Sequence, residues 1–238
     1  MSKPTIVLVH GSFGDASSWR SVFDILDGDE YTVLAPANPL RGLANDASYL
    51  QGLIDQLDGP VVLVGHSYGG PVITVAGKSD KVVGLVYVAG VVPDEGESVS
   101  DLQGRFPPLA EGQVLQPRPL PDGGAEITVD PERFHEVFSA DLPDADAAFM
   151  AHAQRPVSPE AFEEPATAAA WRAKPSWAVF GTEDLPVGPP LHRFQYDRAG
   201  STVTEVEGAS HLLMLSQPDV VARVIRDAVT ALTVSAVA

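Results

Sequence analysis

The segment Pro60-Val61-Val62-Leu63-Val64-Gly65-His66-Ser67-Tyr68-Gly69 decides the expected fold of this 238-residue chain. Its first half is an apolar run typical of a buried strand, and its second half has the spacing Gly-x-Ser-x-Gly before a stretch that suits a helix. A turn from strand to helix within one residue strains the backbone at its apex, and glycines two positions to either side leave room for it. Ser67 is therefore the best candidate in the chain for a covalent nucleophile.

The same geometry would raise the Ser67 hydroxyl above the sheet edge, at the positive end of the following helix, where developing negative charge is stabilised. The alternative is an ordinary glycine-rich turn whose serine only caps the helix. The apolar run directly before the motif favours the nucleophile.

Short apolar runs recur along the chain with helical patterns between them. Runs that are apolar on both faces are expected of a parallel sheet between layers of helices. The sequence therefore predicts an α/β fold with about six mainly parallel strands, at residues 5–9, 31–35, 61–64, 83–89, 177–180 and 202–206. Amphipathic spacing predicts helices at residues 19–26, at 43–57 and from 216 onwards.

Residues 94–174 interrupt this alternation, so we expect a core of residues 1–93 and 175–238 with an inserted cap. The insertion is rich in proline, and its one convincing strand pattern is at 126–129. Short helices are expected at 130–138, at 144–154 and from 158. Because the insertion follows the fourth strand, it should cover the carboxyl ends of the sheet and line a pocket with Phe, Leu and Met side chains.

The chain has 15 Lys and Arg residues against 32 Asp and Glu residues, a formal net charge of −17. Such a balance repels nucleic acids and anionic membrane surfaces, so neither is an expected partner. The sequence contains no cysteine, which excludes thiol catalysis, disulfides and cysteine-based zinc sites.

The apolar stretch at the N-terminus is too short for a signal peptide, and no segment has the length of a membrane span. A cytoplasmic protein is the simplest expectation. No heptad pattern indicates an oligomeric state, and no cofactor or metal ion is expected.

A serine hydroxyl needs a nearby base to remove its proton, and histidine is suited to that role. His211 follows the last expected strand, on a short loop at the sheet edge that would also carry Ser67. A structural or surface role is expected for the other five histidines, His10, His66, His135, His152 and His192.

The base needs an acidic partner that holds its tautomer and offsets its charge. Asp184 follows the strand at 177–180, which gives the chain order Ser67, Asp184, His211 that is expected when the nucleophile stands on a Gly-x-Ser-x-Gly turn of this kind. Glu183 and Asp94 are the alternatives.

The tetrahedral intermediate of acyl transfer needs two backbone donors. One expected donor is the N–H of Tyr68, directly after the nucleophile. The other is the N–H of Ser12, in the turn after the first strand, where Gly11 allows close approach of the backbone.

With these residues together, the chain resembles the α/β-hydrolase superfamily over its whole length. The motifs Val9-His10-Gly11-Ser12-Phe13-Gly14, Val64-Gly65-His66-Ser67-Tyr68-Gly69-Gly70, Val92-Pro93-Asp94-Glu95-Gly96 and Gly208-Ala209-Ser210-His211 look like those of bacterial relatives of the plant methylesterase and hydroxynitrile lyase group. The resemblance implies an α/β-hydrolase fold with a helical cap. It also implies Ser67, Asp184 and His211 as the catalytic triad and Ser12 and Tyr68 as oxyanion donors.

The lyases of that group have a threonine and a lysine where this sequence has Gly11 and Leu212, which favours ester hydrolysis over cyanohydrin cleavage. Related epoxide hydrolases and dehalogenases have aspartate in place of Ser67. The leading hypothesis is a cofactor-free carboxylesterase for small to medium, mainly apolar esters. The alternatives are a lactonase, thioesterase or perhydrolase with the same residues, or a ligand-binding receptor without significant turnover.

Overall fold

The computed structural model describes residues 3–29, 31–110, 112–121 and 123–235 and contains one six-stranded sheet. All its neighbouring strands are parallel. Each strand coincides with one of the six apolar runs, so the predicted α/β-hydrolase fold is confirmed. The strand order is β2 (Val33–Leu34), β1 (Thr5–Val9), β3 (Val61–His66), β4 (Val82–Val88), β7 (Ser176–Gly181) and β8 (Thr202–Val206).

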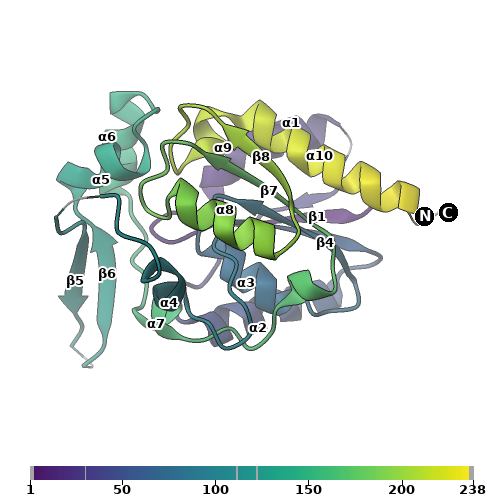
Figure 1. Ribbon diagram of the computed structural model, residues 1–238, viewed down its shortest axis with the longest axis horizontal. Helices are drawn as coiled ribbons and strands as arrows, with labels where there is room; N and C mark the ends of the chain where they lie inside the picture. Colours follow the sequence, from purple (N-terminus) through teal and green to yellow (C-terminus); the bar gives the residue numbers. More distant parts are fainter. Residues whose placement is uncertain (1–2, 30, 111, 122, 236–238) are drawn as a thin grey trace.

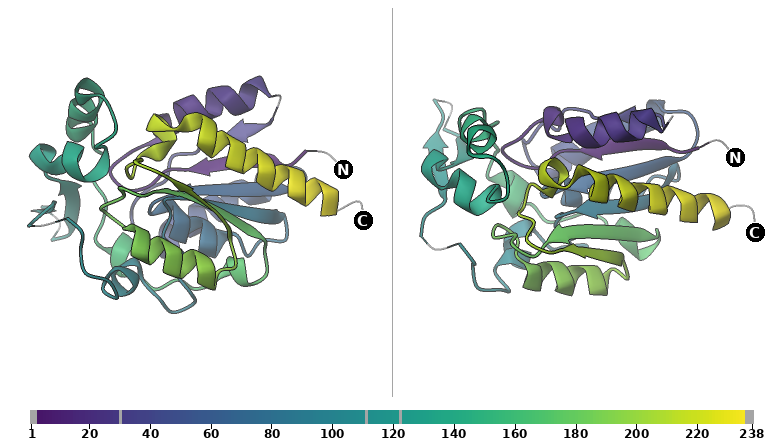
Figure 2. Two further views of the ribbon diagram at one scale, coloured as in Figure 1. Left: turned by 45° about the horizontal axis from the view of Figure 1, so that its top comes forward. Right: turned by 90° about the horizontal axis from the view of Figure 1, so that it is seen from above.

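Helices cover both faces of this sheet (Figures 1 and 2). One face carries α1 (Arg20–Gly28) and α10 (Pro218–Ser235), which pack on each other. The other carries α2 (Leu43–Gln56), α3 (Gly69–Ala76) and α8 (Pro189–Arg198). All six residues of β3 are buried between these layers, which explains why its sequence is apolar on both faces.

Between β4 and β7 the chain leaves the sheet, and we call residues 94–174 the insertion. Most of it lies at the end of the molecule opposite the two termini (Figure 1). Its elements are α4 (Val99–Gln103), β5 (Leu115–Pro119), β6 (Ala125–Val129), α5 (Pro131–Phe138), α6 (Asp144–His152), α7 (Glu160–Glu163) and the short 3-10 helix η2 (Ala170–Arg172). Two more short elements belong to the core, η1 (Ala16–Trp19) and α9 (Leu213–Ser216).

The insertion is not wholly helical, which corrects the expectation of a helical cap with at most one strand. Strands β5 and β6 pair antiparallel and form a hairpin. The sequence gives no signal for β5 because all five of its residues are exposed, so they show no alternation of apolar and polar side chains. Two of the five, Pro117 and Pro119, are also residues that disfavour a strand interior.

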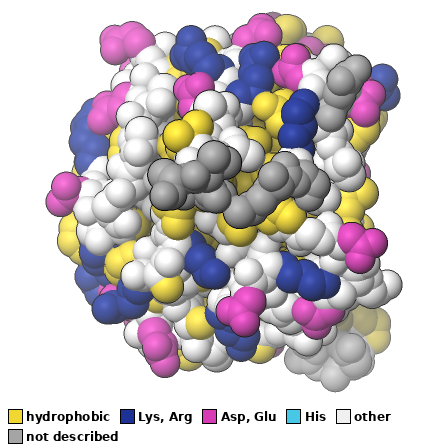
Figure 3. Space-filling view, turned by 90° about the vertical axis from the view of Figure 1, so that its right-hand side faces the viewer, with side chains coloured by type: hydrophobic (Ala, Val, Ile, Leu, Met, Phe, Trp, Pro, Cys, Tyr) yellow, Lys and Arg dark blue, Asp and Glu magenta, His cyan; other side chains and the backbone are white. Residues whose placement is uncertain are grey.

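The excess of acidic residues does not form a single patch on the end of the molecule near the termini. Figure 3 shows that Lys and Arg side chains are interspersed with Asp and Glu over this face. In the described part of the chain, no helix has both the length and the apolar character needed to cross a bilayer.

Candidate active site

Ser67 stands at the turn between β3 and α3 with a φ of 51°, in the left-handed region that serine rarely adopts. Side chains at the neighbouring glycines would prevent this turn. A Cβ on Gly65 would come to 2.5 Å from the carbonyl oxygen of Gly69, and a Cβ on Gly69 would collide with the carbonyl oxygen of Val9. The spacing Gly-x-Ser-x-Gly is therefore a packing requirement of the turn that presents Ser67.

The structure brings Ser67, His211 and Asp184 together from three different strand ends. The Nε2 atom of His211 lies 2.8 Å from Oγ of Ser67, and its Nδ1 atom lies 2.7 Å from Oδ2 of Asp184. An ionised carboxylate can only accept hydrogen bonds, so Nδ1 carries the proton and Nε2 is free to accept the serine proton. This is the geometry that activates a serine nucleophile.

Asp184 is fully buried, and both of its carboxylate oxygens accept hydrogen bonds. Oδ1 faces the backbone N–H groups of Val187 and Gly188, at 3.0 and 3.4 Å. Burial alone would raise the pKa of the Asp184 carboxyl, but the His211 and His192 imidazoles outweigh it and hold the pKa well below its ordinary value. The carboxylate is therefore charged, as the partner of a base must be.

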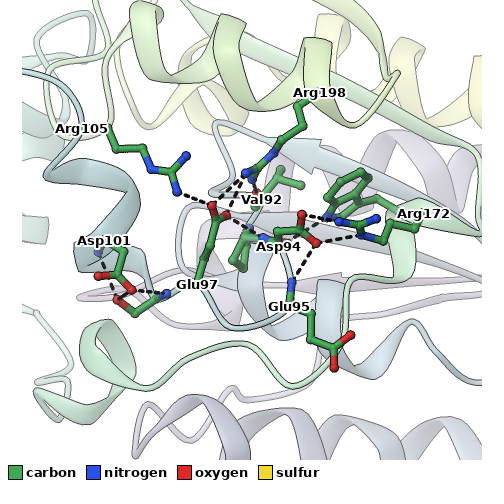
Figure 4. A network of polar contacts seen from close by, with 11 residues as sticks. Val92, Asp94, Glu95, Glu97, Asp101, Arg105, Arg172 and Arg198 are labelled. Atoms are coloured by element: carbon green, nitrogen blue, oxygen red, sulfur yellow. Dashed lines mark hydrogen bonds and ion pairs between the residues drawn. The ribbon is translucent and has the colours of Figure 1, made fainter.

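The two alternative acids lie elsewhere. Glu183 is exposed. Asp94 forms an ion pair with Arg172, whose Nε and Nη2 atoms lie 2.8 and 2.5 Å from its two carboxylate oxygens. This pair joins the two ends of the insertion, beside Glu97 and its partners Arg105 and Arg198 (Figure 4). The Arg172 guanidinium is also the main cause of the lowered pKa of Asp94.

The two expected oxyanion donors border the same space as Ser67. Both Ser12 and Tyr68 line the cavity that contains Ser67. Within the described residues, neither backbone N–H donates a hydrogen bond to another protein group. Both N–H groups are therefore free to bind a negatively charged oxygen, although the role itself is a proposal that is argued below.

A cavity of about 720 Å³ opens beside Ser67. The insertion supplies much of its wall, and the side chains that line it are mainly apolar. Among the described residues of the lining, none is Lys, Arg or His, and Glu163 is the one carboxylate. The aromatic and aliphatic part of the wall includes Phe106, Leu109, Ile127, Val137, Phe138 and Phe162.

A second cavity, of about 210 Å³, borders His211. Its lining includes Met150, a methionine of the insertion, as expected for a pocket wall formed by the cap. Phe13 and Phe138 line both cavities. Their rings meet edge to face, with the centroids 5.8 Å apart. These two rings therefore form part of the wall between the two spaces.

Comparison with known proteins assigns the family. The model of the alpha/beta hydrolase family matches residues 6–224, which include the core strands, apart from the first residue of β1, and the whole insertion. The chain belongs to the alpha/beta hydrolase family. The match ends within α10, so it includes every residue of the site described above.

Relatives of this hydrolase include named esterases. The chain is 27% identical over 254 residues to the alpha/beta hydrolase nvfD of Aspergillus novofumigatus (strain IBT 16806), covering 96% of this chain and 97% of the relative. It is 31% identical over 121 residues to Methylesterase 8 of Arabidopsis thaliana, which is 44% of each chain. The crystal structure of polyneuridine aldehyde esterase has the same fold, with a TM-score of 0.80 at 20% identity, over 95% of this chain and 99% of that one.

Two histidines of this hydrolase have contacts at the site that the sequence does not reveal. His10 receives a hydrogen bond from the N–H of Asn38 at Nε2 (2.9 Å), so Nδ1 carries the proton and donates to the carbonyl oxygen of Gly11 (2.9 Å). His192 lies 3.0 Å from Asp184. The sequence offers only a hint of this contact: His192 lies eight positions after Asp184, near the start of α8, which begins at the sheet edge where β7 ends.

The remaining histidines bind backbone carbonyl groups. Nε2 of His66 lies 3.1 Å from the carbonyl oxygen of His211, and burial lowers the pKa of His66 to about 3. His135 and His152 contact the carbonyl oxygens of Leu142 and Ala148. These contacts agree with the structural roles expected from the sequence.

Proposed function

We propose that this hydrolase is a serine carboxylesterase that acts on small to medium, mainly apolar carboxylic esters. One observation carries the proposal: the hydrogen-bonded series of Ser67, His211 and Asp184 opens onto an apolar cavity of about 720 Å³. The likeness to Methylesterase 8 and to the fold of polyneuridine aldehyde esterase supports the ester as the bond that is cleaved.

In the acylation step, Oγ of Ser67 attacks the ester carbonyl carbon while its proton passes to Nε2 of His211. Asp184 stabilises the imidazolium that forms. The carbonyl oxygen becomes an anion, which the N–H groups of Ser12 and Tyr68 bind at the positive end of α3. The intermediate then collapses, the bond to the alcohol oxygen breaks, and the leaving alcohol takes the proton from His211.

In the deacylation step, a water molecule takes the place of the alcohol. His211 removes a proton from the water, and the oxygen attacks the carbonyl carbon of the acyl-enzyme. The second tetrahedral intermediate uses the same two N–H donors. Its collapse returns the proton to Ser67 and releases the carboxylic acid, so that one ester and one water give one acid and one alcohol.

The cavity lining supports an uncharged, apolar substrate. The described lining contains no Lys or Arg side chain that could pair with a free carboxylate or a phosphate on the substrate. The carboxylate of Glu163 would repel such anionic groups. Because the insertion lines much of this cavity, we propose that residues 94–174 act as a cap that sets substrate size. The buried Leu212 stands where the related lyases carry a lysine, which supports hydrolysis.

Rapid mixing with a p-nitrophenyl ester tests the proposal. We expect a burst of about one nitrophenolate per chain, followed by slower turnover. Ser67→Ala should abolish both phases. Ser139→Ala is the matched control, because this buried hydroxyl has no hydrogen-bond partner among the described residues and should leave the burst intact.

Two further results separate the alternatives. A fluorophosphonate should add one covalent group, at Ser67, and mass spectrometry of the digested protein locates it. Tight ligand binding with neither a burst nor an adduct would support the receptor and contradict the esterase. A panel of oxygen esters, thioesters and lactones distinguishes the related hydrolases.

A cytoplasmic location of the protein stays a prediction.

A further inference from the structure

Asp184 binds a second histidine besides His211. Oδ2 of Asp184 lies 2.7 Å from Nδ1 of His211 and 3.0 Å from Nε2 of His192, so both imidazoles converge on one oxygen atom. The other oxygen already faces the two backbone N–H groups of the loop before α8. His192 comes from α8 and is fully buried, and the catalytic steps proposed above do not use it.

Gln195, one turn further along α8, fixes which ring nitrogen of His192 carries the proton. The N–H of Val92 lies 2.9 Å from Oε1 of Gln195, so this atom must be the amide oxygen. The amide nitrogen then donates to the carbonyl oxygen of Gly90 (2.8 Å) and to Nδ1 of His192 (3.2 Å). Nδ1 is therefore an acceptor without a proton, and Nε2–H points at Asp184.

The imidazole of His192 is also fixed by aromatic packing. Its ring stacks on Phe180 and on Tyr196, with centroid distances of 4.8 and 5.3 Å and interplanar angles of 30° and 16°. Burial lowers the pKa of His192 against the opposing effect of Asp184. The ring is therefore held neutral, in one orientation and one tautomer.

We propose that His192 is a positioning residue for the reaction: locked by Gln195 as a neutral Nε2–H donor, it holds Oδ2 of Asp184 in line with Nδ1 of His211. The inference rests on the proposed function of Ser67, His211 and Asp184. A carboxylate that rotates away from His211 loses the geometry that orients the base, and small displacements of this kind reduce rates strongly. Neutrality matters because a cation at His192 would compete with the His211 imidazolium for Asp184.

Few ionisable groups lie close enough to affect the protonation of His192. Asp184 accepts the Nε2–H of the ring, and the charge of His211 acts on the ring as well. Tyr196 on α8 stacks on the ring, and its hydroxyl donates to the carbonyl oxygen of Gly90. Glu205 on β8 acts on it from farther away and is held by an ion pair with Arg193.

Two substitutions separate positioning from packing. His192→Phe keeps an aromatic ring packed against both Phe180 and Tyr196 but removes the donor, and we expect kcat to fall about 10- to 100-fold with little change in KM. His192→Gln retains an N–H at a similar distance from the backbone and should recover kcat to within about fivefold. The downfield proton resonance of His211 Nδ1 should move in the Phe variant and return in the Gln variant.

Tyr196→Phe is the packing control. It removes the hydroxyl that donates to the Gly90 carbonyl oxygen (2.8 Å) but leaves the stack on His192 and every contact of Asp184. This variant should lower Tm and keep kcat. A folded His192→Phe enzyme with wild-type kcat and an unchanged His211 resonance would overturn the inference while leaving the role of Ser67 intact.

A measurement on the unmodified protein keeps the inference testable if His192→Phe does not fold. Nitrogen NMR of labelled histidine distinguishes the two neutral tautomers and the imidazolium. We expect His192 to be neutral, with the proton on Nε2, from pH 7 to pH 9. An Nδ1–H tautomer or an imidazolium in that range would contradict the proposal, whereas inactivity of the enzyme with this tautomer present would count only against the proposed function.

Discussion

Gly11 lies against Ser67 so closely that a methyl group on the glycine would come to 2.7 Å from Cβ of the serine. The same methyl group would lie 2.9 Å from both Nδ1 and the carbonyl oxygen of His66. A Cβ cannot lie closer than about 3 Å to a neighbouring atom unless one of the two shifts. The loop after β1 and the nucleophile turn therefore depend on each other for their positions.

Gly11→Ala should reduce kcat by about 100-fold, because the loop must move and take the N–H of Ser12 away from the developing oxyanion. The control is Gly14→Ala in the same loop, where a Cβ would have no atom within 4 Å. Gly14→Ala should keep kcat within about twofold. Steady-state kinetics on one p-nitrophenyl ester compare the variants, and equal losses in both would contradict the argument.

Asp184→Asn should lower kcat by about 10³- to 10⁴-fold, because an amide can donate to Nδ1 of His211 and so favour the wrong tautomer. Asp94→Asn is the comparison, since its carboxylate pairs with Arg172 at the ends of the insertion. This ion pair is exposed, so its loss should change the free energy of unfolding only slightly. A loss of kcat in Asp94→Asn as large as in Asp184→Asn would show that the acid is wrongly assigned.

Substrate size should depend on Leu109, a half-exposed side chain of the insertion that lines the 720 Å³ cavity. Leu109→Trp reduces the space, so kcat/KM should fall about tenfold for long-chain acyl esters and stay near the wild-type value for acetate esters. Val203→Trp on β8 is matched in exposure, 41% against 42%, and does not line the cavity. Equal effects on long and short esters in Leu109→Trp would refute this role.

The sequence was sufficient to predict the sheet and the meeting of Ser67, Asp184 and His211. Each of these residues follows an expected strand, and the carboxyl ends of parallel strands lie at the same edge of a sheet. It was insufficient for His192. The contact of His192 with Asp184 depends on how the intervening loop turns at Gly188, which has a φ of 86°, and on the Gln195 amide that fixes the ring. Strand β5 was missed for a different reason. It pairs with the neighbouring strand β6, but its exposed residues show no alternation of apolar and polar side chains.

Acid should destabilise the protein partly through His66, whose buried imidazole has a pKa of about 3 in the folded chain. The unfolded imidazole has a pKa of about 6.5. Between these values the unfolded state binds about one more proton than the folded state, so the free energy of unfolding falls as pH decreases, by about 1.4 kcal/mol per pH unit for one such group. The pKa values of His10 and His192 are also lowered by burial, so both add to this loss.

His66→Gln keeps a donor for the carbonyl oxygen of His211 but removes the titrating group. Urea unfolding from pH 6 down to pH 4 should therefore show a slope against pH that is smaller by about one proton than in the wild type. Measurements at pH 8 serve as the internal control, because His66 is neutral in both states there and the substitution then reports packing alone. An unchanged slope would mean that His66 does not remain neutral in the folded protein, and the burial argument for it would fail.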